Sequence, residues 1–455
     1  MDRRTQPARG MRDFLPDDIR RREHVIGVIT RVYRAYGFEP LETPAVENID
    51  TLLGKYGEEG NKLIFKILKR GEGESSGVAD LALRYDLTVP LARVVAEHRG
   101  KLPKFFKRYQ IQPVWRADRP ARGRFREFYQ CDVDVVGSTS MVVEAELCAA
   151  VADVLRELGF REFVIRLNHR RLLRGMLDAF GIAEPQHEQA LIAVDKLDKV
   201  GREGVAAEFA TRGIPAAAGG RLLDTFEAIA ALRGSVREAR PFNQRAVETL
   251  SAGVGDGASR ALAELAEIVA LSAGTSAGDY LAIDPSLARG LSYYTGAIFE
   301  IAVGDLAGSL GGGGRYDGLV GMFLGEDVPA CGFSLGLERI LVVMTERKMF
   351  PPAVTRGAAD VLVTLFEGEP PADALAVAAM LRQAGLRVDV YPEADKIGKQ
   401  LKLASARGIR FAAIVGESER QADSVTIKDL TAGGQQTMSR ARAASYVSAL
   451  LNPEP

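Results

Sequence analysis

Apolar and polar residues follow two different periods along the chain, and each period predicts an element. Over 17–36 apolar residues recur every three to four positions up to Gly37, which predicts an amphipathic helix ended by a glycine. The segment FEPLETPAVE at 38–47 carries two prolines in an extended pattern; proline cannot donate to a ladder, so we expect an edge or interface strand. A second helix is predicted over 141–158 and a short buried strand over 162–167.

The middle of the chain has a different pattern. Residues 168–280 are rich in alanine, follow a helical period and contain no strand-like run, so we expect a helical insertion. Strand-like segments return at 292–303, before a glycine run at 311–314 and a helix-like segment at 334–344. The outer pieces therefore predict one interrupted domain.

The last hundred residues predict a separate small domain. MFPPAVTRG at 349–357 carries two adjacent prolines, typical of a linker. After it, strands alternate with helices, which favours an α/β domain: strands at 360–366, 387–391 and 410–416, helices at 372–385 and 396–408. The predicted organisation is an interrupted domain at 1–167 and 281–345, a helical insertion at 168–280, a linker at 346–357 and a C-terminal domain at 358–455.

Composition narrows the function classes. A length of 455 residues suits about three domains. The formal net charge of −1 excludes a globally basic nucleic-acid binder. The longest stretch free of charged residues has 11 residues, too short for a membrane span, and the N-terminus leads into no apolar segment, so we expect a cytoplasmic protein. Cys131, Cys148 and Cys331 are widely spaced, which suggests neither disulfides nor a zinc site.

One segment departs strongly from this charge balance. Ten lysines and arginines fall within 99–126 against one acid, Asp118. The run could be a solvated face. Aromatic residues interleave with its arginines, however, and guanidinium groups suit phosphates while aromatic rings suit bases. An anion-binding site is therefore the alternative.

The strand that follows has an acidic face. In FYQCDVDVVG at 128–137, alternation places Gln130, Asp132 and Asp134 on one face. A half-buried strand cannot carry two carboxylates without a cation or donors, so a bound ammonium group is one interpretation. A face exposed to water is the other.

Two short motifs also have ordinary structural interpretations. Asp86 and Thr88 in RYDLTVP fit a helix N-cap. The glycines of GGGGRYDG at 311–318 fit a flexible linker, or a close approach of the backbone to a ligand. No GxxxxGK[ST] motif occurs, so a P-loop nucleotide site is not supported.

Taken together, these segments resemble the histidyl-tRNA synthetases, a family of class II aminoacyl-tRNA synthetases. The likeness covers nearly the whole chain, and each motif can be quoted from it: ARGMRDFLP (8–16) at the start, the helix before FEPLETPAVE as motif 1, VWRADRPARGRFREFYQCDVDVVG (114–137) as motif 2, GFSLGLERI (332–340) as motif 3, and RGLSYYTGAIFE with GGGGRYDGLVGMF as the two histidine-specific signatures. RYDLTVP and FYQCDVDV are similar to the branch shared with eukaryotic cytosolic enzymes.

The resemblance implies an α+β fold: an antiparallel six-stranded catalytic sheet flanked by helices, the helical insertion, and a C-terminal α/β anticodon-binding domain. It also implies a homodimer and a two-step reaction. Histidine and ATP would form histidyl-adenylate and pyrophosphate, and the histidyl group would move to tRNA(His). Magnesium would bridge the ATP phosphates, with no metal ligand expected from the protein's side chains.

Roles carry over to individual residues. Arg116 and Arg289 would be the catalytic cations at the α-phosphate. Histidine would be bound by Asp86, Thr88, Arg116, Gln130, Asp134, Arg289, Tyr293 and Tyr294. ATP would be bound by Arg116, Arg124, Phe128 and Arg339. From charge and position we assign tRNA contacts to Arg119, Arg122, Lys399 and Lys402.

One residue departs from the family pattern. The family usually has Asp in RGLDYY, and this chain has Ser292. If that carboxylate orients a neighbour, serine can replace it by hydrogen bonding; if it contacts the substrate, the replacement puts activity or specificity in doubt. The alternative function is a non-charging paralogue that binds histidine as a regulatory subunit. Such paralogues typically lack the anticodon-binding tail, and this chain has one.

Overall fold

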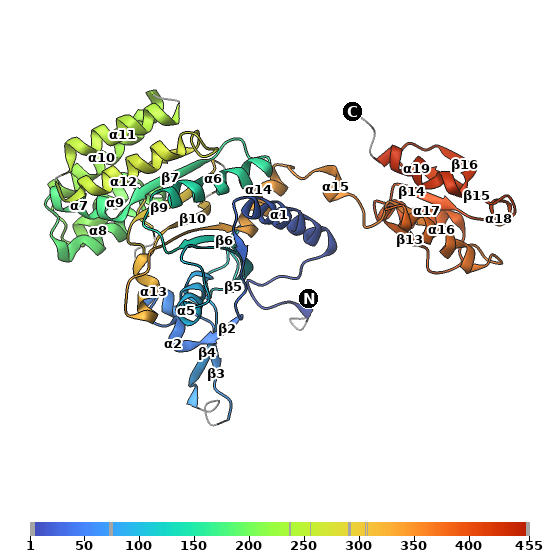
Figure 1. Cartoon of the computed structure of the whole chain (residues 1–455), viewed down its shortest axis with the longest axis horizontal. Coiled ribbons are helices and arrows are strands. Elements are labelled where there is room, and N and C mark those ends of the chain that lie inside the picture. Colours follow the sequence, from blue (N-terminus) through green and yellow to red (C-terminus); the bar gives the residue numbers. More distant parts are fainter. Residues whose placement is uncertain are drawn as a thin grey trace. The chain divides into compact units, whose positions relative to one another are not determined.

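The structure is a computed structural model that describes residues 5–71, 76–235, 238–254, 256–289, 293–304, 306 and 308–451. The chain folds as two compact units, Met1–Met349 and Phe350–Pro455. In Figure 1 the first unit is coloured from blue through yellow to light orange, and the second from orange to red. The division falls inside the predicted linker 346–357. Within the described ranges, no helix has the length and apolar character needed to span a bilayer.

The first unit is organised around one large sheet. Its strand order is β1-β5-β6-β11-β10-β9-β7-β8, with bounds β1 Glu39–Pro40, β5 Phe106–Trp115, β6 Glu127–Val136, β7 Val164–His169, β8 Leu281–Ile283, β9 Ala297–Ala302, β10 Ser309–Arg315 and β11 Ala330–Gly336. The six strands from β5 to β7 pair antiparallel throughout, which confirms the expected sheet. The short strands β1 and β8 extend it by parallel pairing at the two edges.

One face of this sheet is covered by helices. Helix α1 (Pro16–Ala35) packs on α6 (Val142–Glu157), on α14 (Leu337–Glu346) and on β5. Helix α6 packs on β6 and β11, and α14 packs on β6 and β10. The apolar stripe of α1 is buried, with Val25 and Ile29 fully inaccessible, as its period predicts. On β6, Cys131 and Val133 point to this covered face, and Gln130, Asp132 and Asp134 point to the other.

The opposite side carries a smaller structure. Helix α5 (Thr88–His98) precedes β5. Helix α13 (Asp317–Leu324) packs against α5. A three-stranded antiparallel sheet lies next to them, in the order β2-β4-β3 (Val46–Asn48, Ala79–Leu83, Lys66–Leu68). Short helices α2 (Ile49–Leu52) and α3 (Gly57–Lys62) connect these strands. In Figure 1 the hairpin of β3 and β4 projects from the unit.

Six α-helices and one short 3-10 turn fill the middle of the chain within the described residues. Their bounds are α7 Arg170–Ala179, η2 Glu184–Gln186, α8 His187–Val194, α9 Leu197–Thr211, α10 Ala216–Ser235, α11 Ala239–Gly253 and α12 Asp256–Ser272. Helix α12 packs on α7, α6 and β7, so this segment is joined directly to the sheet, as Figure 1 shows in yellow-green. Strand β7 extends through His169, slightly past the predicted boundary at 167.

The second unit is a mixed α/β structure. Its five-stranded sheet has the order β13-β12-β14-β15-β16, with elements α15 Pro352–Thr355, β12 Val361–Val363, α16 Pro371–Gln383, β13 Val388–Val390, α17 Ile397–Ala406, β14 Phe411–Ile414, α18 Glu417–Gln421, β15 Ser424–Asp429, β16 Gln435–Ser439 and α19 Arg440–Leu451. The three predicted strands and two predicted helices are present. The antiparallel strands β15 and β16 and helix α19 were not predicted.

Candidate active site

A small acidic cavity lies on the face of the large sheet opposite to α1, α6 and α14. Its volume is about 180 Å³. The lining includes seven residues that the sequence assigned to histidine: Asp86, Thr88, Arg116, Gln130, Asp134, Tyr293 and Tyr294. They come from the segment that begins α5, from the end of β5, from β6 and from the segment before β9, so the fold brings together positions that are far apart in the chain.

The acidic face of β6 is buried and holds an internal cation. Asp132 and Asp134 are each 2% exposed, so the interpretation of a face exposed to water is wrong. The completely buried guanidinium of Arg108 lies 2.8 Å from Asp134 Oδ2 and 3.8 Å from Asp132 Oδ2. Arg108 sits on β5 directly opposite Asp134. The chain itself therefore supplies one cation to this face.

Asp134 and Asp86 also accept hydrogen bonds from two tyrosines and from the first turn of α5. The Tyr316 hydroxyl donates to Asp134, and the Tyr56 hydroxyl donates to Asp86 Oδ1 across 3.0 Å. Asp86 Oδ1 also accepts from the backbone N–H of Val89 at 3.0 Å. Asp86 thus accepts from the first turn of α5, as the N-cap interpretation expects, while it lines the cavity.

Burial perturbs all three carboxylates. Burial raises the pKa of Asp132 to about 7, against the attraction of Arg108, and the nearby Asp134 raises it further. Burial likewise raises the pKa values of Asp134 and Asp86, with Arg108 and the Val89 N–H opposing it. Three carboxyl groups line the cavity with one guanidinium group, that of Arg116, while Arg108 lies buried beside two of them. This surplus of carboxyl groups fits a cationic ligand.

Gln130 offers an acceptor that the described residues leave unused. Its Nε2 donates to Ser334 Oγ across 2.9 Å. Its Oε1 is buried, and no donor in the described part of the chain reaches it. A buried polar atom without a partner costs free energy. A ligand N–H entering the cavity would satisfy this oxygen.

A second cavity of about 260 Å³ continues from the first. Four residues line both, namely Arg116, Gln130, Gly312 and Ser334. Its wall also holds the predicted ATP residues Arg124, Phe128 and Arg339, together with Arg289. Arg289 lines only this cavity, although it was assigned to histidine as well.

Four guanidinium groups make the lining of the second cavity basic. Burial lowers the pKa of Arg339, and the neighbouring cations Arg124 and Arg289 lower it further. Of the two acids in the wall, Glu338 is occupied, because its Oε1 accepts from Arg22 Nη1 at 2.9 Å. The positive surplus suits a polyphosphate.

Arg116 stands where the two cavities meet. Its Nε donates to the backbone oxygen of Tyr85 across 3.0 Å. Its guanidinium carbon lies 4.3 Å from the centre of the Tyr85 ring and 5.3 Å from that of Phe128. These contacts fix one cation beside both the acidic and the basic cavity.

The glycine run forms the floor between the cavities. Gly311–Gly314 lie inside β10, paired with β9 and β11, so the flexible-linker interpretation is wrong. Gly312 lines both cavities, and Gly313 lines the acidic one. A Cβ on Gly313 would lie 2.1 Å from the backbone oxygen of Gly332. Because these glycines have no side chains, the space above this part of β10 stays open for a ligand.

Several predicted positions lie elsewhere. Arg119 and Arg122 line neither cavity, and Arg122 forms an exposed ion pair with Glu346. Lys399 and Lys402 belong to the second unit, where Lys399 Nζ lies 3.1 Å from Asp395 Oδ2. Ser292 is outside the described residues.

The basic segment 99–126 does not form one surface. Arg108 is buried in the sheet, Lys107 lies 2.8 Å from Glu146 Oε2, and Arg99 pairs with Glu326. The basic side chains of this segment therefore lie in several different parts of the first unit. Only Arg116 and Arg124 of the basic residues in this run line the basic cavity.

Sequence reasoning missed Arg108, Tyr316 and Ser334, all of which complete the acidic cavity. Arg108 had a usable signal: β5 and β6 flank one turn, and antiparallel pairing places Arg108 opposite Asp134 and Gln110 opposite Asp132. Tyr316 and Ser334 enter through β10 and β11, whose place in the sheet has no local signature.

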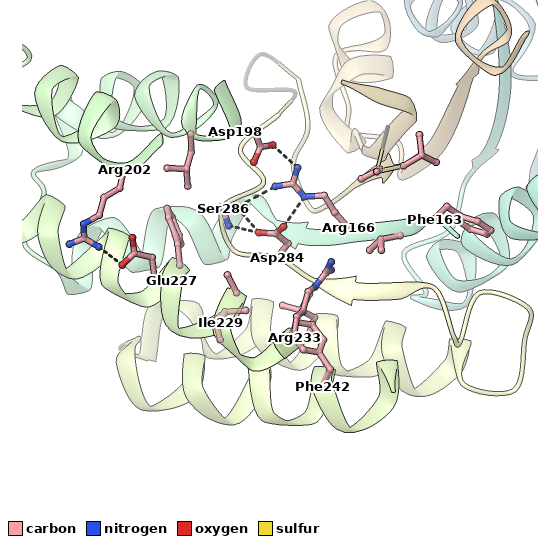
Figure 2. A pocket seen from close by; sticks show the side chains of 18 of the residues that line it. Phe163, Arg166, Asp198, Arg202, Glu227, Ile229, Arg233, Phe242, Asp284 and Ser286 are labelled. Carbon is pink, nitrogen blue, oxygen red and sulfur yellow. Dashed lines mark hydrogen bonds and ion pairs between the residues drawn. The ribbon is translucent and has the colours of Figure 1, made fainter. Parts of the chain in front are cut away.

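The largest of the cavities described for this chain contains no predicted residue. It measures about 790 Å³ and lies between strand β7, the edge strand β8 and helices α9, α10 and α11. Figure 2 shows apolar side chains such as Phe163, Ile229 and Phe242 around it, with Arg166 held by Asp284 and Asp198 on one wall.

Comparison with known proteins agrees with this arrangement. A family model described as histidyl-tRNA synthetase matches residues 10–340, and one described as anticodon binding domain matches 360–450. The chain is 42% identical to histidine–tRNA ligase of Gloeobacter violaceus over 97% of its length and 98% of the relative. It is 41% identical to the same-named protein of Porphyromonas gingivalis, with the same coverage.

Solved structures show the same fold. The histidyl-tRNA synthetase from Nostoc sp. PCC 7120 superposes with a TM-score of 0.80 at 31% identity, covering 98% of this chain and 99% of that one. An ATP phosphoribosyltransferase regulatory subunit/histidyl-tRNA synthetase from Bacillus halodurans has a TM-score of 0.73 over 91% of this chain, and at 21% identity it shows the fold alone. By these matches over nearly its full length, this chain belongs to the histidyl-tRNA synthetase family.

Proposed function

We propose that the protein is a histidine–tRNA ligase, which joins L-histidine to tRNA(His) through a histidyl-adenylate. The observation that carries this function is the junction of an acidic cavity and an arginine-lined cavity at Arg116. An amino acid brings an ammonium group to the first, and ATP brings phosphates to the second. The two would meet where the carboxylate must attack the α-phosphate.

The acidic cavity would bind histidine through its ammonium and imidazole. Asp86, Thr88, Gln130 and Asp134 would hold the ammonium, and the partnerless Gln130 oxygen supports this. Tyr293 and Tyr294 would line the imidazole pocket. A buried site that hydrogen-bonds a substrate's polar groups rejects analogues without them by about 10⁴-fold or more.

The basic cavity would bind ATP. Arg116 and Arg289 would act at the α-phosphate, with Arg124 and Arg339 on the phosphate tail and Phe128 against the adenine. Catalysis would rest on positioning and on stabilising charge at phosphorus, so no side-chain nucleophile is required. Mg²⁺ would accompany ATP and supply positive charge that offsets the charge of its phosphates.

The partner assignments complete the proposal. Arg119 and Arg122 would face the tRNA acceptor end, and Lys399 and Lys402 the anticodon. The match of 360–450 to an anticodon-binding family supports the second pair. The active form would be a cytoplasmic homodimer, supported by the likeness of the α1 region to motif 1 of the class. The anticodon-domain match also argues against a regulatory paralogue without a tail.

Histidine-dependent ATP–pyrophosphate exchange tests the proposal. We expect exchange with histidine and none with the other nineteen amino acids. Arg116→Ala should lower the rate by about 10²-fold or more, because one cation at the reacting phosphate is lost. Arg245→Ala, an exposed position on α11 outside both cavities, is the matched control and should exchange normally.

Aminoacylation separates the second step. Purified protein should charge tRNA(His), and Lys399→Ala with Lys402→Ala should reduce this without changing exchange. A folded protein that binds histidine but exchanges with no amino acid would contradict the proposed ligase.

A further inference from the structure

Two arginines from different segments converge on one buried carboxylate behind the basic cavity. Glu300 lies in β9 and is 4% exposed. Its Oε2 lies 2.5 Å from Nε of Arg289, and its Oε1 accepts from Nη1 of Arg166 at 3.2 Å. The two oxygens of Glu300 are therefore divided between the two arginines.

The sheet fixes the position of Glu300. In the antiparallel pairing of β7 with β9, Glu300 is the register partner of Arg166, and on its other side it faces Gly312 of β10. Gly312 lines both cavities. The carboxylate is thus placed by backbone pairing on both sides, on the strand next to the floor of the site.

Arg166 is itself held rigidly. Its Nε donates to Asp284 Oδ2 across 2.7 Å and its Nη1 to Asp198 Oδ2 across 2.7 Å. Figure 2 shows this guanidinium with Asp284, Ser286 and Asp198 around it. Because these further partners hold it in place, Arg166 acts as a fixed support for Glu300.

Arg289 is more exposed than Arg166 and has fewer partners. Its side chain is 42% exposed, and it follows β8 in a segment without regular structure. Its ion pairs, to Glu300 and to Asp195 at 3.7 Å, both use Nε. Within the described residues its terminal nitrogens make no hydrogen bond, and they lie in the wall of the basic cavity, where a ligand can reach them.

We propose that Glu300 is a positioning residue for Arg289: it holds Nε from the sheet so that the terminal nitrogens point to the reacting phosphate. The inference rests on the proposed function, which places Arg289 at the α-phosphate. A long exposed side chain without such a support samples many rotamers, and a misplacement of about 1 Å costs about 10²-fold in rate.

The test is Glu300→Gln in pyrophosphate exchange. We expect kcat to fall by about 10²-fold while KM for histidine stays unchanged, since Glu300 does not line the acidic cavity. Glu300→Asp, which keeps the charge, should recover part of the loss. Glu227→Gln is the matched control: Glu227 is exposed and pairs with Arg202 at 2.8 Å, away from Arg289.

A double-mutant cycle separates positioning from general stability. In an Arg289→Ala background, Glu300→Gln should lower kcat no further, with all four proteins compared at equal folded fraction as checked by thermal unfolding. The inference is overturned if Glu300→Gln exchanges like the wild type, or if it lowers kcat by the same factor with and without Arg289. A wild type without histidine-dependent exchange would instead contradict the proposed function.

Discussion

Asp86, Asp132 and Asp134 lie in one small cavity, and the buried Arg108 supplies an internal cation to two of them. Removing charges from water is expensive, and mutual attraction repays it only where pairing is complete. Here Arg108 contacts Asp134 at 2.8 Å and Asp132 at 3.8 Å, and burial raises the pKa of each. The charged forms of these carboxyl groups are therefore disfavoured in the unliganded site, and a bound ammonium group would stabilise them.

Asp132→Asn should change how stability depends on pH. The folded protein keeps the Asp132 proton up to about pH 7, whereas the unfolded chain releases it near the ordinary value of 3.8. Raising the pH between these values therefore removes stability from the wild type, by at most about 1.4 kcal/mol per pH unit and by less because Asp134 shares the titration. Thermal unfolding from pH 5 to 8 should show the wild type losing stability relative to the variant up to about pH 7. A difference independent of pH would refute this.

Arg108→Met should destabilise the first unit strongly. It leaves two buried carboxylates without their shared cation, a loss of about 3–5 kcal/mol. Chemical denaturation measures it. Lys107→Met is the matched control on the same strand, since Lys107 pairs with a partly exposed Glu146 and should cost about 1 kcal/mol or less. Equal effects of the two changes would contradict the electrostatic role of Arg108.

Strand β10 shows how an element can shape a site by lacking side chains. Four consecutive glycines occupy the middle of the sheet, although glycine weakens strands. Their pairing with β9 and β11 compensates by supplying ladder hydrogen bonds on both edges. The result is a floor without side chains on which both cavities rest.

Gly313→Ala should therefore be costly. Its Cβ would meet the Gly332 oxygen at 2.1 Å and the Phe333 Cα at 2.7 Å, which forces the strands apart at a cost of about 1–3 kcal/mol. Gly220→Ala on helix α10 is the control: its Cβ meets nothing within 4 Å, so helix propensity should make it neutral or stabilising. Thermal unfolding and histidine binding measure both. A tolerated Gly313→Ala would show that the floor can move.

The elements illustrate what a local pattern can predict. Helix α1 was predicted within one residue because its apolar stripe and terminal glycine are both local signals. Strand β10 was not predicted, because four glycines carry no period. Strands β15 and β16 were missed because residues 424–439 are mostly polar; β16 lies at the edge of the sheet.

The whole chain consists of two units with separate cores. The second unit buries its own apolar cluster, which includes Val361, Leu381, Phe411 and Ile427. A core of this kind supports independent folding. Nothing in its sheet depends on a strand of the first unit.

We expect a fragment of residues 350–455 to fold alone. Its circular dichroism should show mixed helix and strand, and it should unfold cooperatively. Calorimetry of the full chain should show a transition at the temperature of the isolated fragment. A fragment that remains unfolded would show that the second unit depends on the first.

By itself, the sequence determined amphipathic helices such as α1 and α6, the place of the linker and the residue types of the site, because amphipathic periods, adjacent prolines and motif spacing are local signals. The predictions for Asp86, Gln130 and Tyr294 in one cavity came from the family resemblance, not from spacing. Tertiary structure alone decided that Arg108 neutralises the acidic strand, that glycines form the floor and that Glu300 contacts Arg289. Each of these depends on which strands become neighbours in the sheet, and that choice is made by burial across the whole chain.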